Sequence, residues 1–240
     1  MEKLLLRDYG EGLLEITWSF RERRALSEDT TRGQSEDTVE IREASVRRAR
    51  RHIKRKTLHG GLDHLLSLDF KDNVTELRVA LRALRLFCDR VQAAIPGWKY
   101  LATRERQKRG AWHFHMAVKG RQDVKLLRSI WWSVVGERKG NIDVQEPRAR
   151  KTKNRRVYVA EYISKYIGKD LEDWQLNKKM YYHSKNVEDP PVEEVAIVLN
   201  AELSVWDWID DLLQSRFGGM ELVYKWSDPF GENFGFATTF

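Results

Sequence analysis

The chain has 240 residues, enough for one sizeable hydrophobic core or for one domain with extensions. With 41% hydrophobic and 33% charged residues its composition is ordinary for a soluble protein, and no apolar run approaches the roughly 20 residues that cross a bilayer. The single cysteine, Cys88, excludes an intramolecular disulfide and a cysteine-rich zinc site. The apolar stretch at the N-terminus is too short for a signal peptide. We therefore expect a cytoplasmic protein with no membrane partner.

Positive charge is unevenly distributed along the chain. Lysine and arginine number 43 against 36 aspartate and glutamate residues, which leaves a formal charge of +7. Basic residues concentrate between Arg42 and Lys56 and again between Arg148 and Arg156, whereas the C-terminal part leans acidic. On a cytosolic protein such clusters indicate a polyanionic partner, although each run could instead be a solvated helix face.

Composition and pattern divide the chain into three segments. Residues 27–38 are polar and indicate a loop, and residues 39–58 have the pattern of a basic helix that ends before Gly60. Near the C-terminus, residues 205–213 form an amphipathic acidic helix suited to packing or to a protein contact. The expected divisions are an N-terminal extension over 1–58, a catalytic domain over 59–195 and an acidic helical extension over 196–240.

Strand-like and helical patterns alternate in the central segment. They follow one another as strand 62–70, helix 75–94, strands 98–105 and 111–118, helix 124–135, strand 141–144, helix 157–169 and strand 180–184. The basic turn 106–110 joins the two adjacent strands into a hairpin. This order predicts an α+β fold in which a central antiparallel sheet of about five strands is flanked by α-helices.

The second strand of this hairpin carries a His-x-His pattern. Because residues two apart on a strand point to the same face, His113 and His115 project together, and Phe114 between them projects to the other face. Neutral imidazoles are common ligands of divalent metals. The pair therefore predicts a metal site, and the alternative is a pair of surface histidines on an amphipathic strand.

A carboxylate on the neighbouring strand could complete this site. If the turn centres near Arg109, Glu105 lies directly opposite His113, at the close spacing of a cross-strand pair. Two imidazoles and a carboxylate suit a divalent ion such as Mn²⁺ or Mg²⁺ and leave positions open for a phosphate oxygen. We therefore predict that His113, His115 and Glu105 hold such an ion.

The helix expected over residues 157–169 has two distinct faces. At about 100° per residue one face carries aliphatic side chains that can pack on the sheet. The other face carries Tyr158, Tyr162, Lys165, Tyr166 and Lys169. An aromatic stripe of this kind can serve as core, but the lysines on the same face favour a site open to a ligand.

Tyrosine can act as a nucleophile on a phosphodiester. Its oxygen can attack the phosphorus and hold the cut end covalently, so that the bond can later be resealed. Tyr162 and Tyr166 are one helical turn apart and could take turns in two cuts. Lys165 and Lys169 could help to neutralise the developing charge.

Together these residues resemble the HUH endonuclease superfamily, named for a histidine-hydrophobic-histidine motif. The HUH motif is His113-Phe114-His115, and the upstream acidic ligand matches Glu105. The sequence Tyr162-Ile163-Ser164-Lys165-Tyr166 resembles the motif of two-tyrosine rolling-circle replication initiators (Rep proteins) of plasmids and bacteriophages. The resemblance covers roughly residues 45–190.

The resemblance implies the HUH nuclease fold, a central antiparallel sheet flanked by helices, over residues 59–195. It implies metal-dependent nicking of single-stranded or hairpin origin DNA, a 5′-phosphotyrosine intermediate, and strand transfer or ligation. The sequence has no Gly-x-x-x-x-Gly-Lys-Ser/Thr motif, so we expect unwinding by a host helicase. A two-tyrosine transposase or relaxase of the same superfamily remains an alternative, as does a non-catalytic nucleic-acid-binding module.

Basic side chains predict where DNA would lie. They surround the metal hairpin, occupy the basic helix and precede the tyrosine helix. The residues expected to contact DNA are Arg104, Arg106, Lys108, Arg109, Arg47, Arg48, Arg51, Lys54, Lys153, Arg155 and Arg156. The nine tryptophans exceed what a core of this size usually needs, so some could stack on unpaired bases.

Overall fold

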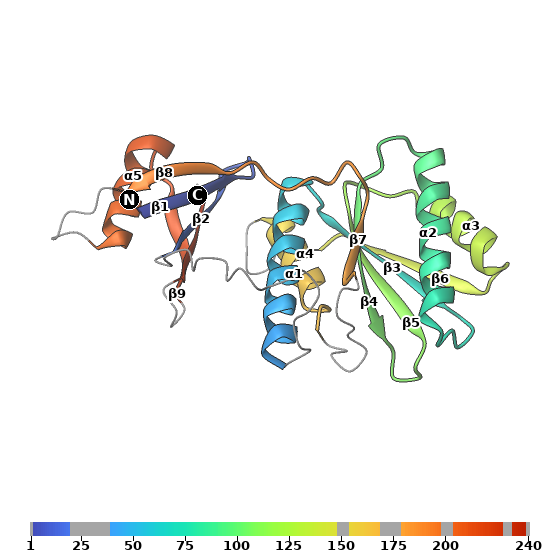
Figure 1. Ribbon diagram of the computed structural model, residues 1–240. Coiled ribbons are helices and arrows are strands. Elements are labelled where there is room, and N and C mark those ends of the chain that lie inside the picture. The colour runs from blue at the N-terminus through green and yellow to red at the C-terminus, as the bar shows by residue number, and fades with distance from the viewer. Residues whose placement is uncertain are drawn as a thin grey trace. The chain divides into compact units, whose positions relative to one another are not determined.

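The chain forms two compact units. The computed structural model describes residues 2–19, 39–147, 154–168, 179–197, 204–227 and 232–238 (Figure 1). We call Ser35–Asp189 the central unit, and Met1–Gln34 together with Pro190–Phe240 the terminal unit. This grouping differs from the boundaries expected at residues 58 and 195, because the basic helix packs with the central sheet and the two ends of the chain share a second sheet.

The central unit is built on one antiparallel sheet with strand order β6-β3-β5-β4-β7. The strands are β3 (His64–Phe70), β4 (Tyr100–Arg106), β5 (Trp112–Val118), β6 (Gly140–Gln145) and β7 (Tyr181–His183). The five-stranded antiparallel sheet and the α+β class expected from the sequence are thus confirmed.

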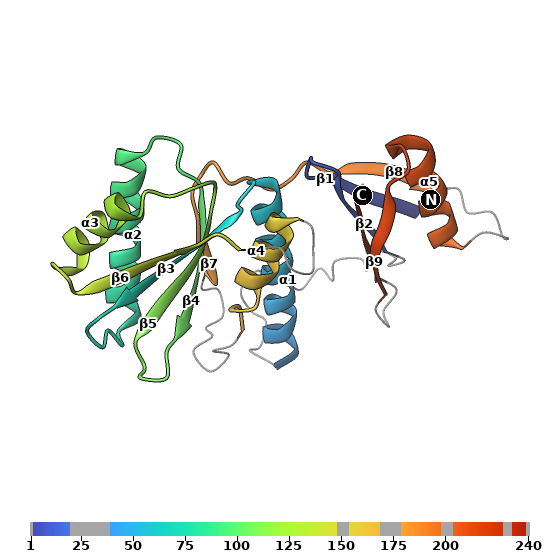
Figure 2. The same cartoon turned by 180° about the vertical axis from the view of Figure 1, so that it is seen from behind.

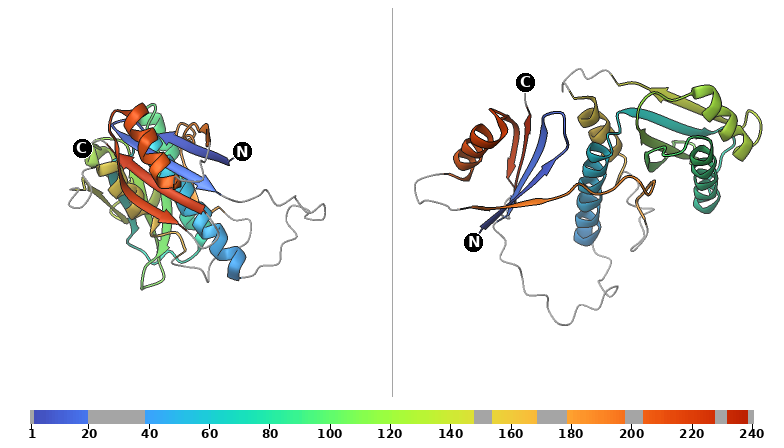
Figure 3. Two further views of the ribbon diagram at one scale, coloured as in Figure 1. Left: turned by 90° about the vertical axis from the view of Figure 1, so that its left-hand side faces the viewer. Right: turned by 90° about the horizontal axis from the view of Figure 1, so that it is seen from above.

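One face of this sheet packs on two helices, α2 (Leu77–Ala94) and α3 (Val124–Val135). The views in Figures 2 and 3 show both helices on the same side of the sheet. Every second side chain of β5 faces them, so that Phe114 packs in one cluster with Phe87 of α2 and Trp131 of α3. Asp123 caps α3, because its carboxylate accepts hydrogen bonds from the backbone of Lys125 and Leu126.

The opposite face of the sheet packs on α1 (Val39–His59) and α4 (Arg155–Ser164). Ile53 of α1 and Ile163 of α4 form one cluster with Leu65, Leu101 and Ala117 of the sheet. These sheet residues lie toward one end of their strands. The other end of the same face carries the polar side chains of β3, β4 and β5.

Helix α4 is shorter than the pattern over residues 157–169 predicts. It begins after Asn154, whose side chain accepts from two backbone amides, and it ends at Ser164. The chain then turns to Gly168, where φ is 85°, and an added Cβ there would lie 2.8 Å from Val46 of α1. The close approach and the positive φ together require glycine, so the helix ends against α1.

The terminal unit contains a second antiparallel sheet, with strand order β8-β1-β2-β10-β9. Its strands are β1 (Glu2–Asp8), β2 (Leu13–Ser19), β8 (Glu193–Ile197), β9 (Glu221–Ser227) and β10 (Glu232–Thr238). Helix α5 (Val205–Phe217) is the amphipathic helix expected near the C-terminus, and Ile209 and Leu213 pack with Leu4, Leu6 and Ile16. In the described parts of both units, no helix is both long and apolar enough to cross a bilayer.

Candidate active site

The histidine pair lies on the central strand of the central sheet. His113 and His115 point to the same face, their rings are 4.3 Å apart between centroids, and each residue is only 9% exposed. The neighbouring strands place a carboxylate on either side, since Asp69 of β3 and Glu105 of β4 both pair with His113 in register. The register between Glu105 and His113 expected from the sequence is therefore present.

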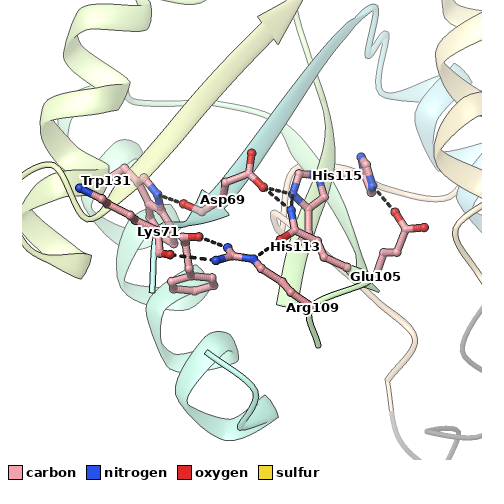
Figure 4. Close-up of polar contacts among 9 residues, drawn as sticks. Asp69, Lys71, Glu105, Arg109, His113, His115 and Trp131 are labelled. Atoms are coloured by element: carbon pink, nitrogen blue, oxygen red, sulfur yellow. Dashed lines mark hydrogen bonds and ion pairs between the residues drawn. The ribbon is translucent and has the colours of Figure 1, made fainter. Parts of the chain in front are cut away.

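Each carboxylate binds one imidazole (Figure 4). Asp69 Oδ1 lies 2.5 Å from His113 Nδ1 and accepts a second hydrogen bond from Gln107 Nε2 at 2.7 Å. Glu105 Oε2 lies 2.9 Å from His115 Nε2. The hydrogen bond with His113 is the main cause that holds the pKa of Asp69 below its usual range, against the opposing effect of burial.

Asp69 is the site residue that sequence reasoning missed. Its contact with His113 is the arrangement by which a carboxylate fixes the orientation and tautomer of a metal-binding imidazole. The pattern of β3 contained a signal for it. Leu66, Leu68 and Phe70 are buried on the α2–α3 face, so Asp69 must project to the face that carries the histidines.

Tyr162 of α4 and Tyr166 in the turn that follows it lie over the histidine pair. The Tyr166 ring stacks on His115, with centroids 3.5 Å apart and planes 19° apart. Tyr162 meets the same imidazole edge-on at 6.0 Å, and the two tyrosine rings are 5.2 Å apart. Two motifs that are far apart in the sequence are thus brought into one site, because the aliphatic face of α4 packs on the sheet through Ile163.

The surroundings of Tyr166 disfavour its phenolate form. Its pKa is raised well above the usual value, chiefly by burial and next by the hydrogen bond with Tyr162. The negative charge of Glu105 acts in the same direction. Tyr158 extends the tyrosine row outward, because it stacks on Tyr162 at 6.2 Å and is 38% exposed. Tyr166 is therefore a neutral phenol at physiological pH.

The two lysines expected beside the tyrosines have different outcomes. Lys165 is exposed in the turn that follows α4. Lys169 lies outside the described residues, as does Lys153 among the expected DNA contacts.

The two arginines at the start of α4 have partners within the protein. Arg155 forms an ion pair with Glu146 at 2.8 Å. Arg156 is 9% exposed and donates a hydrogen bond to the carbonyl of Leu58, so it serves to join α4 to α1.

Two of the hairpin arginines lie on the face of the sheet opposite the histidines. Arg104 and Arg106 pair in register with Phe114 and Trp112, whose side chains pack on the opposite face of the sheet. The Arg106 guanidinium accordingly lies 4.5 Å from the centre of the Trp112 ring. Side chains alternate along β4, so of Arg104, Glu105 and Arg106 only Glu105 shares the histidine face. A contact of these two arginines with DNA stays a prediction.

The remaining basic residues divide into engaged and exposed ones. Arg109 donates hydrogen bonds to the backbone carbonyls of Phe70 and Lys71, which ties the hairpin turn to the end of β3. Lys108, Arg47 and Arg48 are exposed, and Arg51 and Lys54 are half-buried. Among the expected DNA contacts, Lys108 and the exposed arginines of α1 are thus the side chains most open to a ligand.

The donor types around the histidines suit a divalent metal. Within the described residues, however, no group of three or more His, Cys, Asp or Glu side chains is arranged to hold a metal ion. Each carboxylate instead binds a ring nitrogen. The two imidazoles and the carboxylate of Glu105 on the adjacent strand have the chemistry of a mixed nitrogen and oxygen metal site. The binding of a metal ion by these residues stays a prediction.

Comparison with known proteins gave one family. The model of the replication-associated protein ORF2 family matches residues 63–171. The matched segment runs from the start of β3 through α4 and so contains Asp69, Glu105, both histidines and both tyrosines. Comparisons with curated proteins and with solved structures gave no match. This part of the chain is therefore similar to replication-associated proteins of the ORF2 family, which supports a role as a replication initiator.

Proposed function

We propose that this protein is a rolling-circle replication initiator that nicks single-stranded or hairpin DNA at an origin and joins itself to the 5′ end. The observation that carries the proposal is the stacking of Tyr166 on His115 at 3.5 Å, which brings the tyrosines of α4 and its following turn against the histidine pair of β5. A core stripe of tyrosines would have no need of two imidazoles and two carboxylates beneath it. The family match supports the replication context.

The proposed cut is a transfer of the phosphoryl group from a sugar oxygen to a tyrosine. The phenolic oxygen of Tyr162 or Tyr166 forms a bond to the phosphorus, and the bond from phosphorus to the 3′-oxygen breaks. The phenolic proton passes to solvent and the leaving oxygen takes up a proton, so the other strand end carries a 3′-hydroxyl. The reverse reaction reseals the strand, and the second tyrosine permits a second cut.

The residues beneath the tyrosines would hold the phosphate and a divalent ion. His113, His115 and Glu105 are the proposed ligands of Mn²⁺ or Mg²⁺, and Asp69 orients His113 through the 2.5 Å contact. When bound, such an ion polarises the scissile phosphate and stabilises its developing charge. Lys165, exposed beside the tyrosines, is proposed to assist in neutralising that charge.

The DNA itself would be gripped by the exposed basic residues. Lys108 in the hairpin turn and Arg47 and Arg48 on α1 are proposed phosphate contacts. A host helicase is the proposed partner for strand separation.

The decisive experiment is detection of the covalent adduct. The protein is incubated with Mn²⁺ and a pool of randomised single-stranded oligonucleotides, and adducts are resolved on a denaturing gel and identified by mass spectrometry. The adduct should be carried by Tyr162 or Tyr166, and the double variant Tyr162→Phe with Tyr166→Phe should form none. Tyr158→Phe removes a hydroxyl from the exposed end of the same row and should leave the adduct intact. An undiminished adduct in the double variant would contradict the proposed nucleophiles.

A further inference from the structure

A pocket of about 290 Å³ opens beside the histidine site and has no role in the mechanism above. It lies where the ends of β3 and β6 meet the hairpin turn, and Figure 4 shows three of its residues, Asp69, Lys71 and Arg109. Its lining residues come from the end of β3, from the hairpin turn between β4 and β5, and from the start of β6 with the turn before it. They are Asp69, Phe70, Lys71, Arg109, Arg138, Gly140 and Asn141.

The walls of this pocket are held in place by hydrogen bonds. Trp131 Nε1 donates to the carbonyl of Asp69 at 3.0 Å, and Trp132 Nε1 donates to the carbonyl of Gly140 at 2.8 Å. A Cβ at Gly140 would lie 2.2 Å from the indole nitrogen of Trp131, so only glycine allows β6 to approach this closely. The pocket is therefore preformed, which lowers the cost of ordering it around a ligand.

The lining is cationic. Lys71 and Arg138 are exposed, and within the described part of the chain neither side chain forms an ion pair or a hydrogen bond. The charge of Arg109 is added to theirs, whereas the single acid, Asp69, is bound to His113. Exposed lysine and arginine side chains around a preformed pocket are suited to a phosphate. Asn141 adds an amide that can both donate and accept hydrogen bonds.

The size of the pocket limits the ligand. A volume near 290 Å³ is at the lower end of the range for small-molecule sites. This volume suits one nucleotide of a DNA strand better than a longer segment. The cationic lining and the neighbouring site together indicate a nucleotide next to the bond that is cut.

The position of the pocket indicates which nucleotide. Tyr162 and Tyr166 contact His115, whereas the pocket begins at Asp69, which is bound to His113. The tyrosines and the pocket thus adjoin different members of the histidine pair. In an in-line displacement at phosphorus the attacking and the leaving oxygen lie on opposite sides. A phosphate above the histidines that is attacked by a tyrosine would therefore direct its leaving 3′-oxygen toward the pocket.

We propose that this pocket binds the nucleotide that carries the leaving 3′-oxygen, with its 5′-phosphate held by Lys71 and Arg138 and its sugar or base by Asn141. This proposal rests on the proposed function, because it takes the tyrosines as the attacking groups. It explains how the 3′-hydroxyl end stays beside the phosphotyrosine after the cut. The retained end is then available for resealing.

Binding of a mononucleotide tests the pocket without any cutting. The probe is deoxythymidine 5′-monophosphate, titrated into the full-length protein while the indole N–H signals of Trp131 and Trp132 are followed by NMR. Each indole N–H donates to the backbone carbonyl of a residue that lines the pocket, Asp69 or Gly140, so both signals should shift when the nucleotide binds. The double variant Lys71→Gln with Arg138→Gln should weaken binding by about tenfold or more, the effect of losing charge-assisted hydrogen bonds.

A matched variant controls for the loss of charge. Arg82→Gln with Lys125→Gln removes two exposed positive charges from α2 and α3, away from the pocket lining, and should bind the nucleotide as the wild type does. The double variant Tyr162→Phe with Tyr166→Phe should also bind normally. Absence of binding by the wild type, or equal binding by the Lys71 and Arg138 variant, would overturn the pocket even if covalent adducts form. Normal nucleotide binding without adducts would overturn the proposed function and with it the assignment to the leaving nucleotide, while the pocket would stand as a nucleotide site.

Photo-crosslinking tests which strand end the pocket takes. Two single-stranded oligonucleotides of mixed sequence carry 4-thiothymidine at either the 3′-terminal or the 5′-terminal nucleotide. The 3′-terminal probe should crosslink to the peptides that contain Lys71 or Asn141. Preferential crosslinking of the 5′-terminal probe at these peptides would assign the pocket to the other side of the cut and overturn the proposal.

Discussion

The two faces of the central sheet use the same strands but bury different chemistry. On the α2–α3 face the side chains are apolar and aromatic, with Phe114, Phe87 and Trp131 packed in one cluster. On the α1–α4 face the apolar cluster occupies one end only, and His113 and His115 occupy the other. One strand, β5, is buried on both faces and carries the core on one side and the candidate site on the other.

The apolar face stabilises the central unit, whereas the polar end of the other face carries the candidate site. On the α2–α3 face the only polar groups of this cluster's buried aromatic side chains are indole N–H groups, and Trp131 Nε1 donates to the carbonyl of Asp69. On the other face, His113 contacts a carboxylate at 2.5 Å and His115 contacts one at 2.9 Å. Buried polar side chains cost free energy unless they are paired. Both histidines of this otherwise apolar strand are accordingly paired with a carboxylate.

The largest expected contrast is between neighbouring residues of β5. Phe114→Ala should lower the free energy of unfolding by roughly 3–5 kcal/mol, because Phe114 is fully buried and a cavity would remain. His115→Ala should cost about 2 kcal/mol or less, the value of its hydrogen bond to Glu105, while the covalent adduct should no longer form. Urea unfolding followed by tryptophan fluorescence measures the stability of both variants. A stability loss in His115→Ala as large as that in Phe114→Ala would show that the two faces are not divided in this way.

Local pattern was sufficient to predict much of this unit. The strand pair β4–β5, its register at Glu105 and the tyrosine face of α4 all follow from spacing along a continuous stretch of chain. The same alternation that places Glu105 opposite His113 directs the side chains of Arg104 and Arg106 to the other face of the sheet. Their positive charge alone does not indicate this direction. Asp69 was missed because it meets His113 through β3, a strand remote in sequence from the hairpin.

The terminal unit shows where local pattern fails. Its sheet pairs β1 with β8 and β2 with β10, so strands from the two ends of the chain must meet before any of them is buried. β1 with β2 and β9 with β10 are neighbours along the chain, but the pairings that join them into one sheet connect strands remote in sequence, for which local spacing gives no signal. Only helix α5, with its regular amphipathic spacing, was predicted.

A smaller effect is expected from the residue that orients the site. Asp69→Asn keeps the shape of the side chain but removes the charge that His113 Nδ1 contacts at 2.5 Å. The affinity for Mn²⁺, measured by isothermal titration calorimetry, should fall by about 10- to 100-fold, the usual effect of losing such a partner. Asp143→Asn provides a control, because Asp143 is an exposed residue on β6 outside the pocket and the site. Unchanged Mn²⁺ affinity in Asp69→Asn would mean that the carboxylate does not act through the histidine.

The smallest expected effect comes from exposed arginines that cover neither face of the sheet. Arg47 and Arg48 lie on the exposed side of α1, and the Arg47 side chain is 64% exposed in a weak pair with Glu43. The variant Arg47→Gln with Arg48→Gln should bind single-stranded DNA several-fold more weakly, and the slope of log affinity against log salt should fall by about 0.7 for each phosphate that is no longer neutralised. Fluorescence anisotropy over a salt series measures this slope. The same charge loss in Arg78→Gln with Arg82→Gln, exposed on α2, should leave the slope unchanged, because α2 covers the face opposite the histidines. An equal fall in both variants would indicate that DNA responds to net charge alone and that α1 forms no part of its path.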